Sequence, residues 1–257
     1  MGDARRLEVK PISSSDANRI VKHLHYSGKV TQNSQLHLGV FIDGRCGGAM
    51  QFGPSLDKRK LIGLVDGTLW NEFIELNRLA FADWLPRNSE SRALGYVFRW
   101  MRKNYTQLKW VVSFADGTQC GDGTIYRASG FALTGITNNS TLYEFPDGER
   151  VSNLGIKTGF AWQMKRFGRR MHGEKALQEA KRLGAKKLPG FQLRYIYFLD
   201  KSARQRLAVP EIPFSEIDRR GAGMYRGVPR VRSDTGDTPS VQDGKGGSIP
   251  TRTLSDG

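Results

Sequence analysis

The stretch "SFADGTQCGDGTIYRASGF", residues 113 to 131, decides most of the fold. It starts as the end of an apolar segment, passes through a loop with three glycines and two aspartates, and continues as a short helix that ends at Gly130. Glycine often ends a helix because it enters the left-handed region without a Cβ clash. The stretch therefore predicts a strand, a glycine-rich acidic loop and a short helix, with Asp116 just past the strand end.

Outside this stretch the apolar periodicity switches between strand and helix. The Asp43-Gly44 pair predicts the turn of a hairpin, Ser14 or Ser15 is expected to cap the first helix, and Asn88 or Ser89 the second. We expect strands at 5–13, 36–42, 45–53, 72–81, 109–116, 131–136, 140–146 and 191–200, and helices at 13–28, 85–105, 124–130 and 173–184.

The charge of the chain points to a polyanionic partner. Its 257 residues carry a net charge of +15, and the pI is near 10.0. The basic excess runs along the whole chain, whereas an ordinary solvated face would concentrate it in one run. Nucleic acid is the expected partner, because lysine and arginine neutralise phosphates and release counterions.

Composition also divides the chain. Residues 1–225 contain enough apolar residues for one domain, whereas 226–257 are rich in Gly, Ser, Asp, Thr and Pro and are expected to be a disordered tail. No segment approaches the roughly 20 apolar residues of a membrane span, and no signal segment is evident, so no membrane partner and a cytoplasmic location are expected. Two cysteines without a CxxC spacing predict neither disulfides nor a zinc site.

Five segments together resemble one protein family. They are "HYSG" at 25–28, "GVFIDGRCGGAMQFGPS" at 39–55, "ELNRLAF" at 75–81, "PRNSESRALG" at 86–95, and the stretch at 113–131. In this combination the chain resembles the Mom family of bacteriophage DNA modification proteins, from about residue 12 to 140 and more weakly to about 225. The order of elements is likewise similar to that of GNAT acyltransferases.

The resemblance implies a fold and an activity. The fold would be α+β and GNAT-like, with a mixed, mostly antiparallel central sheet, helices on both faces and a donor held between two splayed strands. The activity would convert adenine in double-stranded phage DNA, in the host cytoplasm, to its N6-carbamoylmethyl form and so hide restriction sites. Such an enzyme must take the base out of the stack to reach N6.

The resemblance also implies site residues. Catalytic roles fall on Asp116, Glu75, Tyr126, Ser113, His25 and Tyr26, and cofactor-binding roles on Asn77, Arg78, Asn88, Ser89 and Ser91.

Several of these residues have structural alternatives. Asp116 could cap the following turn, Tyr126 could belong to the core, and His25 could interact with a helix end. Glu75 and Arg78 could form an ion pair, although a separation of three places them on opposite faces of a regular strand. Asn88, Ser89 and Ser91 could be only a helix cap, or an anion site at the helix N-terminus.

The donor stays open between two molecules. The loop "LPRNSES" at 85–91 lacks the glycine pattern with which GNAT enzymes usually hold the pyrophosphate of coenzyme A. Acetyl-CoA alone would leave N6 bonded to a carbonyl, whereas a glycyl group from charged tRNA can rearrange to the carbamoylmethyl product, so bond connectivity favours glycyl-tRNA. Iron held by His25 with Asp116 or Glu75 is conceivable, but no spacing motif supports it, and no metal ligand is assigned.

Two other functions compete with this one. A GNAT-like relative could acylate RNA or a basic protein, and a basic DNA-packaging protein could use the same scaffold without catalysis. A packaging protein, however, has no need of Asp116, Glu75 and Tyr126 around one cleft. The oligomeric state and the target sequence are not readable from the chain.

Overall fold

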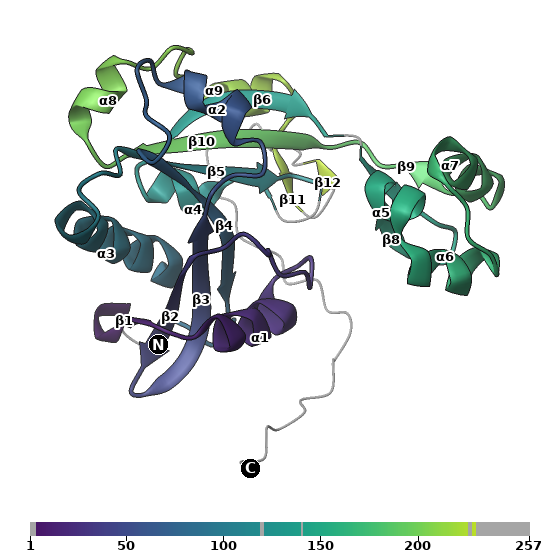
Figure 1. The fold of residues 1–257 in the computed structure, drawn as a ribbon, viewed down its shortest axis with the longest axis horizontal. Coiled ribbons are helices and arrows are strands. Elements are labelled where there is room, and N and C mark those ends of the chain that lie inside the picture. The colour runs from purple at the N-terminus through teal and green to yellow at the C-terminus, as the bar shows by residue number, and fades with distance from the viewer. Residues whose placement is uncertain (1–3, 119–120, 140, 226–227, 230–257) are drawn as a thin grey trace, which may run out of the picture.

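The computed structural model describes residues 4–118, 121–139, 141–225 and 228–229. Its main feature is a seven-stranded sheet in the order β1-β2-β3-β4-β5-β10-β6 (Figure 1). The strands are β1 (Glu8–Pro11), β2 (Leu36–Ile42), β3 (Arg45–Gly53), β4 (Phe73–Phe81), β5 (Trp110–Asp116), β6 (Ala132–Asn138) and β10 (Phe191–Phe198). Every neighbouring pair is antiparallel except β4 and β5, which are parallel.

The parallel strands β4 and β5 separate soon after they meet. They pair only from Phe73–Glu75 to Trp110–Val112, although β4 continues to Phe81 and β5 to Asp116. Beyond Val112 the Ser113 hydroxyl still donates to the Leu76 carbonyl over 3.3 Å. An antiparallel sheet with one parallel pair that splays apart is the expected GNAT-like arrangement, and the predicted fold class is confirmed.

A β-bulge distorts β4 at the start of the splay. Gln51 of β3 pairs with Arg78 and Phe52 pairs with Leu76, so Asn77 is the extra residue. A bulge of this kind shifts the alternation of side chains by one position. Glu75 and Arg78 therefore both reach the same cavity, and the prediction that they lie on opposite faces is wrong for this physical reason.

Helices cover both faces of the sheet. On one face α3 (Ser89–Asn104) buries Leu94, Phe98 and Met101, next to α4 (Thr124–Ala128) and α9 (Ser215–Arg219). On the other face lie α1 (Ser14–Leu24), α2 (Lys58–Leu61), the 3-10 helix η2 (Ile62–Leu64) and α8 (Lys201–Gln205). A further 3-10 turn, η1 (Ala4–Arg6), precedes β1. The two faces alternate as strand geometry requires: Val111 packs with α3, and its neighbours Trp110 and Val112 with α2 and α8.

Residues 141–190, between β6 and β10, form a separate small unit, which we call the insertion. It contains β7 (Leu142–Glu144), β8 (Arg150–Ser152), β9 (Lys186–Lys187), α5 (Asn153–Thr158), α6 (Phe160–Phe167) and α7 (Gly173–Arg182). Its own core includes Tyr143, Phe145, Ile156 and Leu177. Figure 1 shows it beyond the ends of β6 and β10, apart from the large sheet.

Most predicted elements of the large sheet are confirmed, including the hairpin, whose Asp43 and Gly44 have φ of 50° and 78°. The predicted caps of the first helix are wrong, because Ser13 accepts the Asp16 amide there. Asn88 is the N-cap position of α3, without a side-chain capping bond.

The sequence predicted β7 within the strand expected at 140–146, but it did not predict α2, α5, α6, α8, α9 or the strands β8 and β9. Of the predicted tail, 226–227 and 230–257 lie outside the described residues, and 228–229 form β12 (Val228–Pro229), which pairs with β11 (Met224–Tyr225).

Candidate active site

A cavity of about 600 Å³ opens where β4 and β5 separate. It lies between the second half of β4, the end of β5, the 121–126 loop and helix, and the segment that follows α1. Seven of the predicted site residues line it: His25, Tyr26, Glu75, Asn77, Arg78, Asp116 and Tyr126. These residues come from four segments that are distant in sequence, so the splay and the bulge are what bring them together.

Glu75 is the carboxyl of the cavity whose surroundings disfavour its charge. Burial raises its pKa, and hydrogen bonds from Ser55 and Asn77 and the nearby charge of Arg78 oppose that rise in part. Asn77 is 8% exposed, and its side-chain oxygen also accepts a hydrogen bond from Ser34 over 3.0 Å. A carboxyl whose pKa is raised toward neutrality can take up a proton more readily than an exposed one.

Arg78 is held rigidly beside Glu75 and His25. Its Nε donates to the Lys29 carbonyl over 2.9 Å and its Nη1 to the Asn77 carbonyl over 2.6 Å. No Glu75–Arg78 salt bridge within 4.0 Å is found in the described part of the chain. Its positive charge still lowers the pKa of both neighbouring groups.

His25 is neutral at physiological pH, with a defined tautomer. Burial, and after it the charge of Arg78, lowers its pKa to about 4. The Ser27 amide donates to Nδ1 over 3.2 Å, and the Ser27 hydroxyl lies 2.8 Å from the same atom. A backbone amide can only donate, so Nδ1 is the acceptor and the ring proton lies on Nε2. The ring also contacts Tyr26, with centroids 4.2 Å apart.

Asp116 caps the turn after β5 and also lines the cavity. Its Oδ1 accepts the Thr118 amide over 3.0 Å, which is the expected turn cap, and also the Asn139 side chain over 3.1 Å. The same residue lines the cavity at the end of β5. Two donors on one oxygen fix the orientation of the carboxylate.

The wall formed by the glycine-rich loop is anchored from β10. The hydroxyl of buried Tyr195 donates to the Asp122 carbonyl over 2.5 Å. Burial, and next the charge of Asp122, raises the pKa of Tyr195. A Cβ on Gly123, whose φ is 82°, would lie 2.5 Å from the Tyr195 ring, so only glycine fits there. Tyr126 packs against Tyr195 and Phe131 at 5.2 Å each, so it belongs both to the core and to the cavity.

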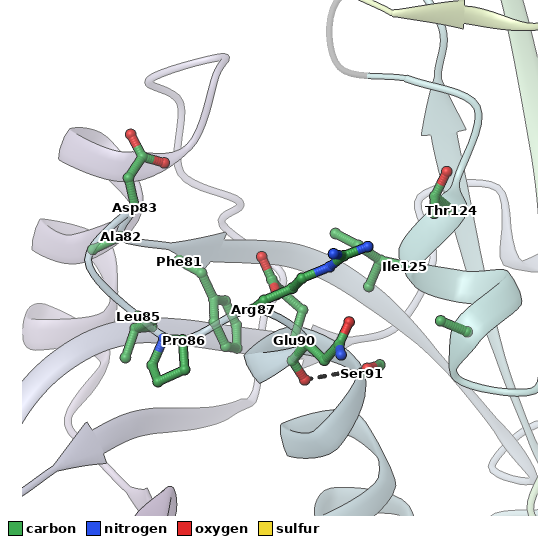
Figure 2. A pocket seen from close by; sticks show the side chains of 12 residues that line it. Phe81, Ala82, Asp83, Leu85, Pro86, Arg87, Glu90, Ser91, Thr124 and Ile125 are labelled. Atoms are coloured by element: carbon green, nitrogen blue, oxygen red, sulfur yellow. Dashed lines mark hydrogen bonds between the residues drawn. The ribbon is translucent and has the colours of Figure 1, made fainter. Parts of the chain in front are cut away.

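A second cavity, of about 370 Å³, adjoins the first (Figure 2). Thr124 and Ile125 line both cavities, and in Figure 2 the Arg87 side chain of the β4–α3 loop extends toward Ile125. Asn88 and Ser91 line this second cavity, and the Ser91 hydroxyl donates to the Asn88 carbonyl over 3.2 Å. Ser89 is fully buried, and its hydroxyl donates to the Pro86 carbonyl over 2.5 Å.

The structure thus separates the eleven predicted residues. Ser113 is buried in β5 and Ser89 at the start of α3, and neither residue lines either cavity. Asp122 and Gln192 line the main cavity but were not predicted as site residues. The position of Asp122 in the glycine-rich loop of residues 113–131 could have indicated a site residue. Gln192 and Tyr195 reach the site only through the pairing of β10 with β5.

Among the residues that the structure describes, no group of three or more His, Cys, Asp or Glu side chains could hold a metal ion. No helix in that part of the chain is long and apolar enough to cross a membrane.

The fold and the cavity define a GNAT-like transferase. The model of the Mom protein family matches residues 6–216. The methylcarbamoylase Mom of Escherichia phage Mu is 38% identical over 205 residues, which cover 79% of this chain and 80% of that protein. The chain therefore belongs to the Mom family.

Solved acetyltransferases are more distant. An IAA acetyltransferase from Bacillus cereus is 10% identical, with a TM-score of 0.39 over 75% of this chain and 99% of its own. A GNAT family acetyltransferase from Elizabethkingia anophelis, solved with acetyl-CoA bound, is 13% identical, with a TM-score of 0.37 over 57% and 93%. At these scores the fold assignment rests on the strand order and the β4–β5 splay instead.

Proposed function

We propose that this protein converts adenine in phage DNA to N6-carbamoylmethyladenine, which protects the DNA from host restriction. The observation that carries the proposal is the cavity in the β4–β5 splay, where a carboxyl of raised pKa, a second carboxylate and a neutral histidine meet. Membership in the family of a methylcarbamoylase supports the same reaction.

The cavity suits a base that has left the duplex. Its volume of about 600 Å³ lies within the usual range of small-molecule sites. Tyr26, 50% exposed at the cavity wall, offers an aromatic face on which a base can stack. Removing the adenine from its pair exposes N6, which is a poor nucleophile because its lone pair is delocalised into the ring.

We assign the acid–base work to the two carboxylates. Asp116, oriented by Thr118 and Asn139, accepts a hydrogen bond from N6 and increases its electron density. Glu75 takes up the proton as the new bond forms, since its raised pKa favours proton uptake. His25, with its proton on Nε2, acts as a donor to the developing oxyanion of the acyl group rather than as a base.

The donor we favour is the glycyl ester of a charged tRNA. Attack of N6 on the ester carbon releases the tRNA hydroxyl and gives N6-glycyladenine. The free amine then attacks C6 through a five-membered ring and expels the original nitrogen as a carboxamide. The product is N6-carbamoylmethyladenine, and this second step is an isomerisation that needs no further reagent. Acetyl-CoA is the alternative donor, and that route requires an added nitrogen source and an oxidation.

Two measurements test these proposals. DNA from cells that express the chain is digested to nucleosides, and the nucleosides are analysed by mass spectrometry. The expected mass is that of the carbamoylmethyl nucleoside. An unmodified result would favour a packaging protein, and acylated RNA or protein would favour the other transferase. Glycine labelled with nitrogen-15 then tests the donor: the label is expected on the nitrogen bonded to C6, and acetate carbon without that label would exclude the glycyl route.

A further inference from the structure

The insertion (residues 141–190) has a higher density of net positive charge than the rest of the domain. It has eleven Lys and Arg residues and five Asp and Glu residues, so it contributes +6 of the +15 net charge in 50 residues. Its core is small and is formed mainly by aromatic and aliphatic residues of its own elements. The catalytic cavity has no lining residue in this range, so the charge needs another explanation.

The acidic residues of the insertion are already paired within it. Their ion pairs are Glu144–Arg150, Asp147–Arg166, Glu149–Arg166, Glu174–Lys157 and Glu179–Arg182. Seven exposed basic residues take part in no salt bridge with any described residue, namely Lys165, Arg169, Arg170, Lys175, Lys181, Lys186 and Lys187. The excess charge is therefore presented to solvent rather than neutralised inside the unit.

Some of this charge surrounds a surface hollow. The hollow, of about 590 Å³, is lined by Arg169, Arg170, His172 and Lys175, with Met171 and Glu174. Glu174 is the acid already paired with Lys157. Nearby, Arg170 lies over the ring of Phe160, which is 56% exposed. Basic groups interleaved with an exposed aromatic ring are typical of nucleic-acid-binding surfaces.

The base of the insertion lies at the mouth of the catalytic cavity. On the β6 side, Asn139 donates to the Asp116 carboxylate over 3.1 Å. On the β10 side, Gln192 pairs with Asp116, and Gly190 is packed so closely against Thr118 that a Cβ would lie 1.6 Å from its hydroxyl oxygen. This tight base fixes where the insertion leaves the sheet.

Lys186 and Lys187 of β9 are consequently within reach of the same duplex. Gln192 follows Lys187 by five positions, so their Cα atoms are at most about 18 Å apart. Along B-DNA that distance corresponds to about five base-pair steps. A duplex that places one adenine in the cavity would thus run its backbone past β9.

We propose that the insertion is a DNA-binding arm that holds the phosphate backbone next to the adenine being modified. The proposal rests on the proposed function for its choice of duplex DNA, since charge alone would also suit a folded RNA. The arm would increase the affinity for DNA of any sequence. Lysine and arginine contacts to phosphates position a protein on the duplex and do not read its bases.

The test compares two triple variants of the full chain that each remove one arginine and two lysines. Arg169→Gln, Lys186→Gln and Lys187→Gln alter the arm. Arg99→Gln, Lys103→Gln and Lys201→Gln alter exposed residues of α3 and α8, which lie away from the insertion in Figure 1. Binding to a labelled duplex of about 20 base pairs, and separately to tRNA, is measured over a range of salt concentrations, with circular dichroism as the folding control.

We expect the arm variant to bind the duplex more weakly than the wild type, and its binding to depend less on salt. If each residue contacts one phosphate, the salt slope falls by about 2.7, and duplex affinity at physiological salt falls on the order of a hundredfold, while the control variant changes less than about threefold. Equal affinities of the two variants for the duplex would overturn the proposal, as would a loss confined to tRNA. If the wild type makes no modified adenine but the arm variant loses duplex binding, the proposed function fails and the arm stands.

Discussion

Tyr195 offers a direct test of how the cavity wall is held. Its hydroxyl donates to the Asp122 carbonyl over 2.5 Å, and the side chain is fully buried. Tyr195→Phe removes only the hydroxyl and keeps the ring contact with Tyr126. Removal of one buried hydrogen-bond donor costs about 1 to 2 kcal/mol. For a domain of this size, that loss lowers the melting temperature by roughly 2 to 8 °C.

A matched control stands two residues further along the same strand. Tyr197 points to the same face of β10, and its hydroxyl accepts a bond from the exposed guanidinium of Arg102 over 2.7 Å. Tyr197→Phe should cost less than about 0.5 kcal/mol, because water replaces an exposed partner. Both variants keep the aromatic ring, so the comparison isolates the buried hydrogen bond.

The assays are thermal unfolding and the yield of modified adenine per cell. We expect Tyr195→Phe to reduce both, since Asp122 and Gly123 would lose their anchor at the cavity, and Tyr197→Phe to leave both near wild type. Equal melting temperatures for the two variants would refute the energetic argument. A destabilised Tyr195→Phe variant with full modification at low temperature would refute the link between the anchor and catalysis.

Three further predictions concern the cavity and its margin. Asp116→Asn should abolish adenine modification while keeping the melting temperature within about 2 °C, because the amide oxygen can still accept from Thr118 and Asn139; full activity would remove Asp116 from the mechanism. Between the ordinary pKa of histidine, about 6.5, and the folded pKa of about 4, only the unfolded chain gains a proton at His25, so stability should fall as pH falls through this window. His25→Asn should weaken that fall in unfolding experiments, and an unchanged slope would contradict the assignment. Gly190→Ala should destabilise the protein by more than about 2 kcal/mol, because its Cβ would meet the Thr118 hydroxyl at 1.6 Å; an unchanged denaturant midpoint would contradict this packing.

The large sheet could be predicted from sequence because its signals are local. The Asp43-Gly44 turn, the apolar face of α3 and the alternation of the strands each depend on neighbours within a few residues. The insertion was less visible for the same reason. Helices such as α5, with six residues, and strands such as β9, with two, are too short to produce a periodic pattern, and their stability comes from the tertiary core around Ile156.

The candidate site could be predicted only as a set of residues. The resemblance placed Glu75, Arg78 and Asp116 in one constellation, but the regular alternation of a strand argues against a shared face for Glu75 and Arg78. The bulge at Asn77, which nothing in the local pattern marks, is what brings them together. The resemblance implied a catalytic role for Ser113. In the structure this residue is buried, and its hydroxyl donates to the Leu76 carbonyl. Contributions from β10 depend on pairing across almost eighty residues of sequence, between Asp116 and Gln192, which no short-range signal reports.

The contrast between a basic chain and an acidic cavity follows from the different tasks of the two regions. Long basic side chains on the insertion would attract phosphates by charge, and this attraction acts at any position along a duplex. Asp116 and Asp122 line a half-enclosed cavity, where carboxylate charge repels phosphate. A neutral base pays no such penalty, and its amino group gains an acceptor on entering. Under the proposed function, the basic surface would therefore determine how tightly the duplex binds, and the acidic wall would determine that the adenine, rather than the backbone, occupies the cavity. The two regions should then fail separately: loss of the arm charges weakens binding at every sequence, whereas loss of Asp116 stops the reaction on DNA that is still bound.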